Sequence, residues 1–253
     1  MDEYRNFTVD KLKVEVFSDR NKMGKYAALY VADQIKGVAK EKEVVRVVFA
    51  SAVSQKEFLG ELLKIEDIPW DKIIAFHMDE YHTLPESAPQ RFGNFLKEHL
   101  FKYRNFGAIH LMNNDLEEYA QLIKEAPIDI ICLGIGENGH LAFNDPPVAN
   151  FGDGEVVKKV VLDDVCRQQQ VHDGAFESIS HVPKTAVTLT IPVLMEADFL
   201  SVVVPGESKA GAVKKTLYDP VSTECPATIL RFHPDVKLFL DTDSAKNIKQ
   251  KKS

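Results

Sequence analysis

The chain has 253 residues, of which 45% are hydrophobic and 27% are charged, and its formal net charge is −7 at pH 7. This composition is ordinary for a globular protein with a substantial core. The acidic balance argues against a nucleic-acid partner, which would require a basic surface. No apolar run approaches about 18 residues and no signal-peptide region is visible, so we expect no membrane span and a cytoplasmic location.

Apolar periodicity predicts strands and helices that alternate along the chain. Strands are expected at 12–17, 44–49, 73–76, 109–112, 128–133, 156–162, 199–204 and 236–240. Helices are expected at 21–40, after residue 54, and at 92–101, 116–123, 163–171 and 206–217. The stretches 187–194 and 226–231 fit either type. Alternation of this kind predicts a single-domain α/β fold with a mostly parallel, open, Rossmann-like sheet and helices on both faces.

The chain shows no repeat, linker or composition step that would mark a domain boundary, so one domain is expected over 1–253. The lysine-rich end, 246–253, is expected to be a flexible tail. The cysteines Cys132, Cys166 and Cys225 have no Cys-x-x-Cys spacing. They indicate neither a disulfide framework nor a zinc site, and reduced thiols are the simplest interpretation.

The strand expected at 128–133 opens into a glycine-rich loop. The spacing of Gly134, Gly136 and Gly139 matches the dinucleotide-binding fingerprint, which needs a helix after the last glycine. Two prolines follow soon afterwards and leave little room for that helix. The better interpretation is a loop whose glycines let backbone N–H groups approach a ligand, with His140 and Asp145 beside it.

Three further loops follow predicted parallel strands and should lie at the same sheet edge. Asp79 and Glu80 form either a solvated turn or, with a nearby histidine, a group for acid–base catalysis near neutral pH. Ser51 and Ser54 could bind an anion, and Ser54 could equally cap the following helix. Lys209 is either a surface lysine or a phosphate contact.

Several segments together resemble the glucosamine-6-phosphate deaminase/isomerase family. They are 76–81, 134–146, 182–190, 206–209 and 226–234, and the Gly-His-x-Ala-Phe-Asn-x-Pro string that begins at residue 139 is specific. The acidic motif at 79–81 separates the chain from the sister 6-phosphogluconolactonases. The resemblance implies isomerisation of a small phosphorylated amino sugar coupled to loss of ammonia, without a metal or other cofactor. It leaves a homo-oligomer open.

The resemblance also implies roles for individual residues. Asp79 matches the base that moves a proton between carbon 2 and carbon 1 of the sugar. His140 matches the residue that assists ring opening, Asp145 its carboxylate partner, and Lys209 a phosphate ligand. The other positions implied in substrate or phosphate binding are Ser51, Ser54, Glu80, Gly136, Gly139, Arg167 and His172.

The chain departs from the family pattern at several of these positions. Asn138 stands where the family has aspartate, so one catalytic carboxylate is missing unless Glu137 replaces it. Asp145 stands for the usual glutamate, and His172 for an arginine that contacts substrate. The loop at 51–55 keeps its hydroxyls but lacks the usual glycines. Two alternatives therefore stay open: a 6-phosphogluconolactonase-type hydrolase, or a catalytically altered paralogue that binds sugar phosphates without turnover.

Overall fold

The computed structural model describes residues 5–113 and 115–249. Its main sheet has eight strands in the order β1-β2-β11-β10-β7-β3-β4-β6. Only the pair β1 and β2 is antiparallel, and the other neighbours are parallel, as predicted. The strands are β1 (Arg5–Val9), β2 (Leu12–Phe17), β3 (Val45–Phe49), β4 (Ile73–His77), β6 (Ala108–His110), β7 (Ile130–Leu133), β10 (Phe199–Val204) and β11 (Val236–Asp241).

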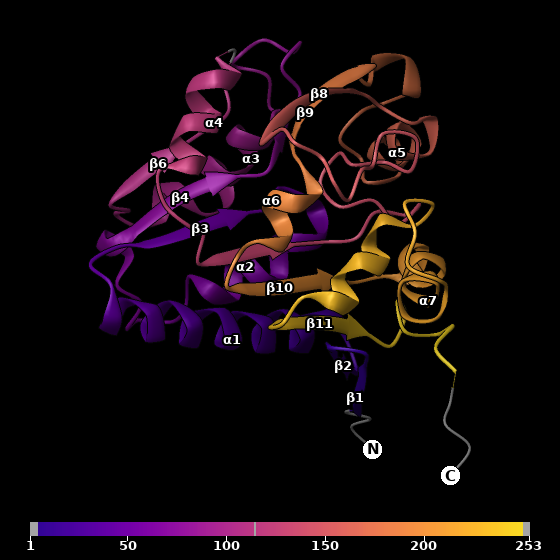
Figure 1. Cartoon of the computed structure of the whole chain (residues 1–253), viewed down its shortest axis with the longest axis horizontal. Helices are drawn as coiled ribbons and strands as arrows, with labels where there is room; N and C mark the ends of the chain where they lie inside the picture. Colours follow the sequence, from indigo (N-terminus) through magenta and orange to yellow (C-terminus); the bar gives the residue numbers. More distant parts are fainter. Residues whose placement is uncertain (1–4, 114, 250–253) are drawn as a thin grey trace.

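Helices cover both faces of this sheet, which confirms the predicted architecture (Figure 1). One face carries α1 (Arg20–Glu41), α2 (Lys56–Leu62) and α3 (Phe92–His99). The other carries α4 (Leu116–Lys124), α6 (Ile191–Met195) and α7 (Ala210–Tyr218). Successive strand side chains point to opposite faces, so Val47 and Phe49 pack with α1 while Val48 packs with the second group.

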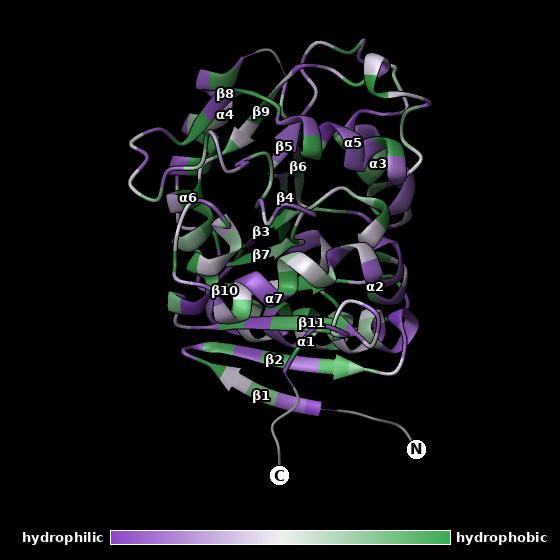
Figure 2. Cartoon of the chain, turned by 90° about the vertical axis from the view of Figure 1, so that its right-hand side faces the viewer, coloured by the Kyte–Doolittle hydropathy of each residue, from purple (hydrophilic) through white to green (hydrophobic). Residues whose placement is uncertain are grey.

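Strands buried on both faces differ in sequence from the outer strands. All five residues of β3 and all four of β7 are buried, and both strands are almost continuously apolar. Strand β2 instead alternates apolar and charged residues, and Figure 2 shows this alternation in colour. Continuous apolar runs are typical of central parallel strands, and alternation is typical of strands with one wetter face.

A second, three-stranded antiparallel sheet lies over the carboxyl ends of the main strands. It pairs β5 (Asp79–Glu80) with β9 (Thr185–Leu189) and β9 with β8 (Val157–Val161). With α5 (Asp164–His172) it encloses a separate apolar cluster that contains Tyr81, Phe143 and Cys166. The sequence predicted a strand at 156–162 but not this separate sheet, because β5 is only two residues long.

The two ambiguous stretches have mixed or tight structure. Residues 187–194 are divided between the end of β9 and α6, and 226–231 lie in a 3₁₀ helix, Pro226–Phe232. The remaining 3₁₀ turns are Val53–Gln55, Trp70–Lys72, Phe101–Tyr103, Ile179–His181 and Glu207–Lys209. Ser54 therefore lies inside a turn, and the residue at the N-cap of α2 is Gln55, so the predicted capping role of Ser54 is wrong.

Part of the segment that was expected to be a flexible tail, 246–253, packs against the rest of the molecule. Lys246 pairs with Glu207, and Ile248 is buried against the main core. The rest of that expected tail, 250–253, lies outside the described residues. Within the described part of the chain, no helix has the length and apolar character needed to cross a membrane.

Candidate active site

Four neighbouring strands of the main sheet, β10, β7, β3 and β4, end at one edge and send their loops into a single pocket. The strand order reverses its direction between β7 and β3, and open α/β sheets bind ligands at such a switch point. The pocket opens to solvent, and its lining mixes apolar and polar side chains, as is usual for small-molecule sites. Its polar lining residues include Ser51, Ser54, Gln55, Asp79, His140, Gln169, Gln170 and Lys209.

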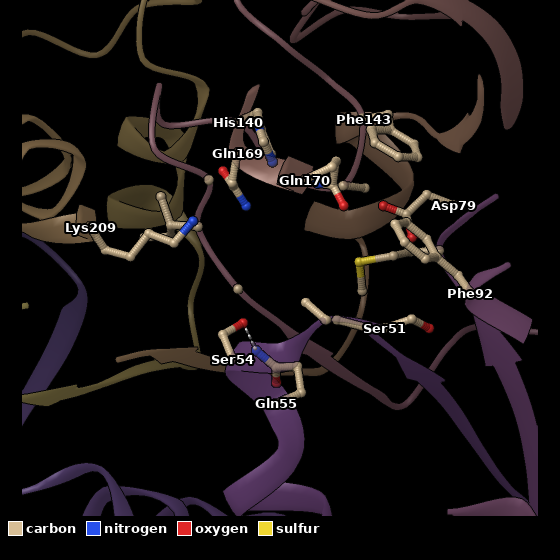
Figure 3. A pocket seen from close by; sticks show the side chains of 17 residues that line it. Ser51, Ser54, Gln55, Asp79, Phe92, His140, Phe143, Gln169, Gln170 and Lys209 are labelled. Carbon is tan, nitrogen blue, oxygen red and sulfur yellow. Dashed lines mark hydrogen bonds between the residues drawn. The ribbon is translucent and has the colours of Figure 1, made fainter. Parts of the chain in front are cut away.

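Lys209 marks one end of the pocket, across from Asp79 (Figure 3). Its residue is only 5% exposed, and its ammonium has no hydrogen-bond partner among the described residues. Burial lowers the pKa of Lys209, and the negative charges of Asp173 and Glu137 oppose that effect. A buried ammonium without a partner is costly to the free protein, so its position favours an anionic ligand at this end.

Hydroxyl and amide groups of the loop after β3 form the floor beside Lys209 (Figure 3). Ser54 Oγ accepts a hydrogen bond of 3.3 Å from Gln55 Nε2, which also donates to the Val203 carbonyl at 3.2 Å. Ser51 Oγ is buried and has no partner within the described structure. The predicted hydroxyls are therefore at the pocket, and the Gln55 side chain holds the loop to β10.

Asp79 lies at the other end of the pocket, beside Phe92 and Phe143 (Figure 3). Burial raises the pKa of Asp79 well above its ordinary value, and the neighbouring Glu80 carboxylate raises it further. A carboxyl group with a raised pKa can take up and return a proton near neutral pH. Asp79 thus has the environment that a proton-transferring base requires.

Glu80 is not among the residues that line the pocket. Its carboxylate accepts hydrogen bonds from the backbone N–H groups of Tyr81, Phe92 and Gly93 at 2.8–3.0 Å. Arg91 Nε also lies 3.3 Å from Glu80 Oε2. Glu80 therefore anchors the amino terminus of α3 and supplies a fixed negative charge beside Asp79, and its predicted contact with substrate gains no support from this placement.

His140 and Asp145 form a buried pair in the wall of the pocket. His140 Nδ1 lies 2.9 Å from Asp145 Oδ1, which leaves Nε2 for the pocket that His140 lines. Burial opposes ionisation of Asp145, but the charge of His140 and hydrogen bonds from His140, Asn138 and the Asp163 backbone lower its pKa. The pair therefore keeps an ionised carboxylate behind the ring, which fixes the orientation of the imidazole.

Asn138 connects this pair to a second carboxylate. Its Nδ2 donates to Asp145 Oδ1 at 3.0 Å and to Asp163 Oδ2 at 3.1 Å, and its Oδ1 accepts from the His140 N–H at 3.0 Å. An aspartate here would place a third carboxylate against the other two. Asn138 thus acts as a neutral bridge, and the carboxylate of Glu137 contacts His172 at 3.5 Å instead of joining His140.

Gly136 makes room for the imidazole ring of His140. A methyl group added to it would lie 2.1–2.3 Å from three atoms of the His140 imidazole, closer than real contacts allow. Gly139 is not in the pocket lining. It adopts a left-handed φ of 90°, its N–H donates to the Gly136 carbonyl, and a Cβ there would meet Cys225 Sγ at 2.5 Å. These two glycines shape the loop around His140.

We expect Gly136→Ala to lower kcat by about 100-fold, because displacing a catalytic group by roughly 1 Å has effects of that size. The added methyl must push the His140 ring away from Asp145 or from the pocket. Steady-state kinetics on a candidate substrate measures the loss. Gly37→Ala is the matched control, since a methyl group at Gly37 meets nothing within 4 Å; equal activity of the two variants would contradict the assigned close approach.

Two predicted residues of the segment after Asp163 lie away from the pocket lining. Arg167 donates to the carbonyls of Ile179 and Val182 at 2.6 and 3.1 Å, and thereby holds α5 to the next loop. The side chain of His172 is 56% exposed. The same helix instead presents Gln169 and Gln170 to the pocket.

Sequence reasoning missed these glutamines, together with Phe92, Phe143 and Asp163. Gln169 Oε1 accepts the Glu137 N–H at 2.8 Å and so links α5 to the glycine loop. The run of three glutamines at 168–170 could have indicated polar contacts with a ligand. The sequence does not show which of the three faces the pocket, because that depends on how the helix is rotated about its axis. Phe92 looked like a core residue of an amphipathic helix, and Phe143 was only part of the family string. Asp163 was the first residue of a predicted helix, and the structure makes it the N-cap of that helix.

The chain is similar to known proteins over most of its length. Residues 18–238 match the family model described as glucosamine-6-phosphate isomerases/6-phosphogluconolactonase. A glucosamine-6-phosphate deaminase of Clostridium botulinum is 33% identical over 92% of this chain and 96% of its own length. One of Halothermothrix orenii is 31% identical over 92% and 99%.

Solved structures resemble the fold over most of its length. The structure of a monomeric glucosamine-6-phosphate deaminase superposes with a TM-score of 0.84 at 28% identity, over 92% of this chain and 99% of the other. A 6-phosphogluconolactonase from Thermotoga maritima superposes with a TM-score of 0.74 at 20% identity, over 91% and 100%. The second likeness concerns the fold alone.

Proposed function

The chain belongs to the family of glucosamine-6-phosphate isomerases and 6-phosphogluconolactonases, and on that premise we propose that it converts glucosamine-6-phosphate, or a closely related hexosamine phosphate, and water to fructose-6-phosphate and ammonia. The relatives at 31–33% identity carry the deaminase name. The observation that carries the proposal is one pocket with two different ends. One end has a buried ammonium that lacks a hydrogen-bond partner among the described residues, and the other has a carboxyl group of raised pKa.

The two ends of the pocket define how the sugar would lie. The phosphate would bind Lys209 and the Ser54 hydroxyl, because a dianion favours a cation and hydroxyl donors. Carbon 1 and carbon 2 would then lie at Asp79, with the sugar chain passing His140 on the wall between them. Gln169 and Gln170 would offer neutral donors and acceptors to the sugar hydroxyls.

The reaction then follows from these groups. His140 Nε2 moves the proton of the carbon 1 hydroxyl to the ring oxygen, which opens the ring to an aldehyde. Asp79, as carboxylate, takes the proton from carbon 2 and returns it to carbon 1, while the carbon 1 oxygen gains the proton that the amine loses, which leaves a ketimine at carbon 2. Water adds to that carbon, ammonia leaves, and the ketose phosphate is formed. Asp145 keeps the His140 ring in place throughout.

Two alternatives make different demands on the same pocket. A lactone hydrolase needs a histidine that activates water, but it needs no second base at the position of Asp79. A binding protein without turnover needs the phosphate end alone. The buried Asp79 with its raised pKa favours the isomerase chemistry over both.

The test is incubation with glucosamine-6-phosphate and its epimers, with ammonia and fructose-6-phosphate measured together. We expect equimolar formation of the two products. Hydrolysis of 6-phosphogluconolactone above its spontaneous rate, without ammonia from any hexosamine phosphate, would replace the proposal by the lactonase reading. Thermal stabilisation by sugar phosphates with no product of either kind would identify a silent binder.

Replacing Lys209 by methionine should raise KM about 10- to 100-fold, because a hydrogen bond to a charged group contributes roughly 1.5–3 kcal/mol. The smaller effect should fall on kcat, since Lys209 lies at the opposite end from Asp79. The free variant should be more stable than the parent at neutral and acid pH, because a protein with a buried lysine whose pKa is lowered from 10.5 loses stability as pH falls from 10.5 through the lowered pKa.

Kinetics and thermal unfolding between pH 5 and 9 measure both effects of Lys209→Met. Lys214→Met is the control, because Lys214 is exposed on α7, the helix that follows Lys209. An unchanged KM for Lys209→Met would show that the phosphate does not bind at this end of the pocket.

The remaining expectations belong to the proposal as well. We propose that the reaction uses no metal or organic cofactor, because acid–base groups of the pocket account for each proton transfer. A cytoplasmic location, a homo-oligomer and a single domain with a flexible end remain predictions.

A further inference from the structure

Three metal-ligating side chains meet in the wall of the pocket. A ring nitrogen of His140, a carboxylate oxygen of Asp145 and the Sγ atom of Cys166 all lie within 4.8 Å of one another. The three residues are 8%, 0% and 0% exposed. Cys166 takes no part in the proposed reaction and packs in the apolar cluster with Tyr81 and Phe143, but its Sγ atom also lies beside the His140–Asp145 pair.

The fold holds the three groups together firmly. His140 and Asp145 belong to the loop after β7, whereas Cys166 lies in the first turn of α5. Asp145 joins the two segments, because its carboxylate accepts from the Asp163 N–H at 3.3 Å and from Asn138, which also contacts Asp163. The cysteine is therefore fixed against the pair by the same bonds that orient the pair.

We propose that His140, Asp145 and Cys166 form a binding site for a thiophilic divalent cation of the Zn²⁺ type, and that occupation of this site inhibits the enzyme. Imidazole, thiolate and carboxylate are the ligands that Zn²⁺ takes in proteins, at about 2.0–2.3 Å. Such bonds separate the ligand atoms by about 3–4 Å, so side-chain rotation closes the present spacing.

The surroundings meet two further requirements of a zinc site. Three protein ligands leave the fourth position of a tetrahedral ion for water, on the pocket side that His140 lines. The carboxylate ligand already has the outer hydrogen bonds, from Asn138 and the Asp163 backbone, that tune such sites. Binding converts the Cys166 thiol to a metal-bound thiolate and releases one proton to solvent.

Inhibition follows from the ligands that the ion takes. Metal-bound Asp145 no longer accepts from His140, and metal-bound His140 cannot carry the proton for ring opening. The cation would also lie on the path of the sugar between Lys209 and Asp79. Free zinc would therefore inhibit the proposed reaction, and a chelator would reverse the inhibition.

Titration of the metal-free protein with Co²⁺ and Zn²⁺ tests the site without any turnover. We expect one equivalent to bind, with a thiolate-to-cobalt absorption band in the parent protein and in Cys132→Ala. Cys132 is the matched control, being an equally buried cysteine in β7. Cys166→Ala should lack the band and bind Zn²⁺ at least about ten-fold more weakly, as loss of a ligand weakens a site more than loss of an outer partner.

X-ray absorption on the zinc-loaded parent protein keeps the test decisive if Cys166→Ala does not fold. One sulfur ligand with nitrogen and oxygen ligands is the expected result. Absence of a sulfur ligand, absence of the cobalt band, or equal zinc affinity of Cys166→Ala would each overturn the proposal. These readouts are independent of the substrate, so the zinc site and the proposed reaction stand or fall separately.

Discussion

Replacing Asp79 by asparagine should lower kcat by about 10²- to 10⁴-fold, the usual contribution of a positioned acid–base group. Asparagine keeps the size of the side chain but cannot take the proton from carbon 2. Binding of the sugar phosphate should survive, because Lys209 at the far end is unchanged. Steady-state kinetics gives the loss, and thermal stabilisation by the substrate confirms that binding remains.

The pH dependence of Asp79 gives this prediction a second readout. The base must be ionised, so activity should fall on the acid side of a pKa that lies above the ordinary 3.8. A carboxyl group whose pKa is raised by folding destabilises the protein as pH rises through that pKa. Asp79→Asn should therefore be more stable than the parent at neutral pH, by a margin that shrinks as pH falls through the raised pKa and vanishes below about 3.8. Substantial turnover by the variant would show that the base is misassigned.

Restoring the carboxylate of the family pattern with Asn138→Asp should damage the enzyme instead of improving it. The substitution removes donors to Asp145 and Asp163 and places a third carboxylate against them. Loss of a hydrogen bond to a charged group costs roughly 1.5–3 kcal/mol, and misplacement of His140 should lower kcat by about 100-fold. The loss of stability should grow from acid to neutral pH, as the added group ionises.

A double-mutant cycle with Asp163→Asn isolates the cause. Removing the charge of Asp163 relieves part of the repulsion, so Asn138→Asp should cost less in the Asp163→Asn background than in the parent. Asn150→Asp is the control for added charge, because Asn150 is exposed in the segment that follows the glycine loop. Unfolding and kinetics measure the loss of stability and of kcat that Asn138→Asp causes in each background. Equal losses in the two backgrounds would show that repulsion from Asp163 is not the cause.

The sheet could be predicted because its signals are local. Apolar runs such as β3 and β7 and the amphipathic helices between them follow directly from residue order. Strand β5 could not be predicted, because two residues are too few to show an alternating pattern. Its pairing with β9 joins residues that are more than 100 positions apart in the sequence. The same applies to the second sheet as a whole, which exists only through contacts between distant segments.

The loops of the site were predicted more accurately than the positions of individual side chains within them. Strand ends placed Asp79, His140 and Lys209 in the pocket because parallel strands share an edge. The roles of Glu80 and Arg167 were harder to predict, because a charged side chain can form hydrogen bonds with backbone groups as well as with substrate. Asn138 looked like a lost catalytic group in the sequence, and only the contact with Asp163 shows what the amide does.

The pocket also explains why some buried groups lack partners. Lys209 Nζ and Ser51 Oγ are buried without hydrogen bonds within the described residues, although such groups normally cost about 1–3 kcal/mol each. Both line the pocket. Their cost to the free protein is explained if a polar ligand supplies the missing contacts.

The most direct test of the account is a structure of the protein with an open-chain, reduced analogue of glucosamine-6-phosphate. We expect the phosphate within hydrogen-bond distance of Lys209 Nζ and Ser54 Oγ, carbon 1 and carbon 2 against the Asp79 carboxylate, and His140 Nε2 facing the sugar oxygens. A phosphate bound at the Asp79 end, or an analogue bound outside this pocket, would contradict it.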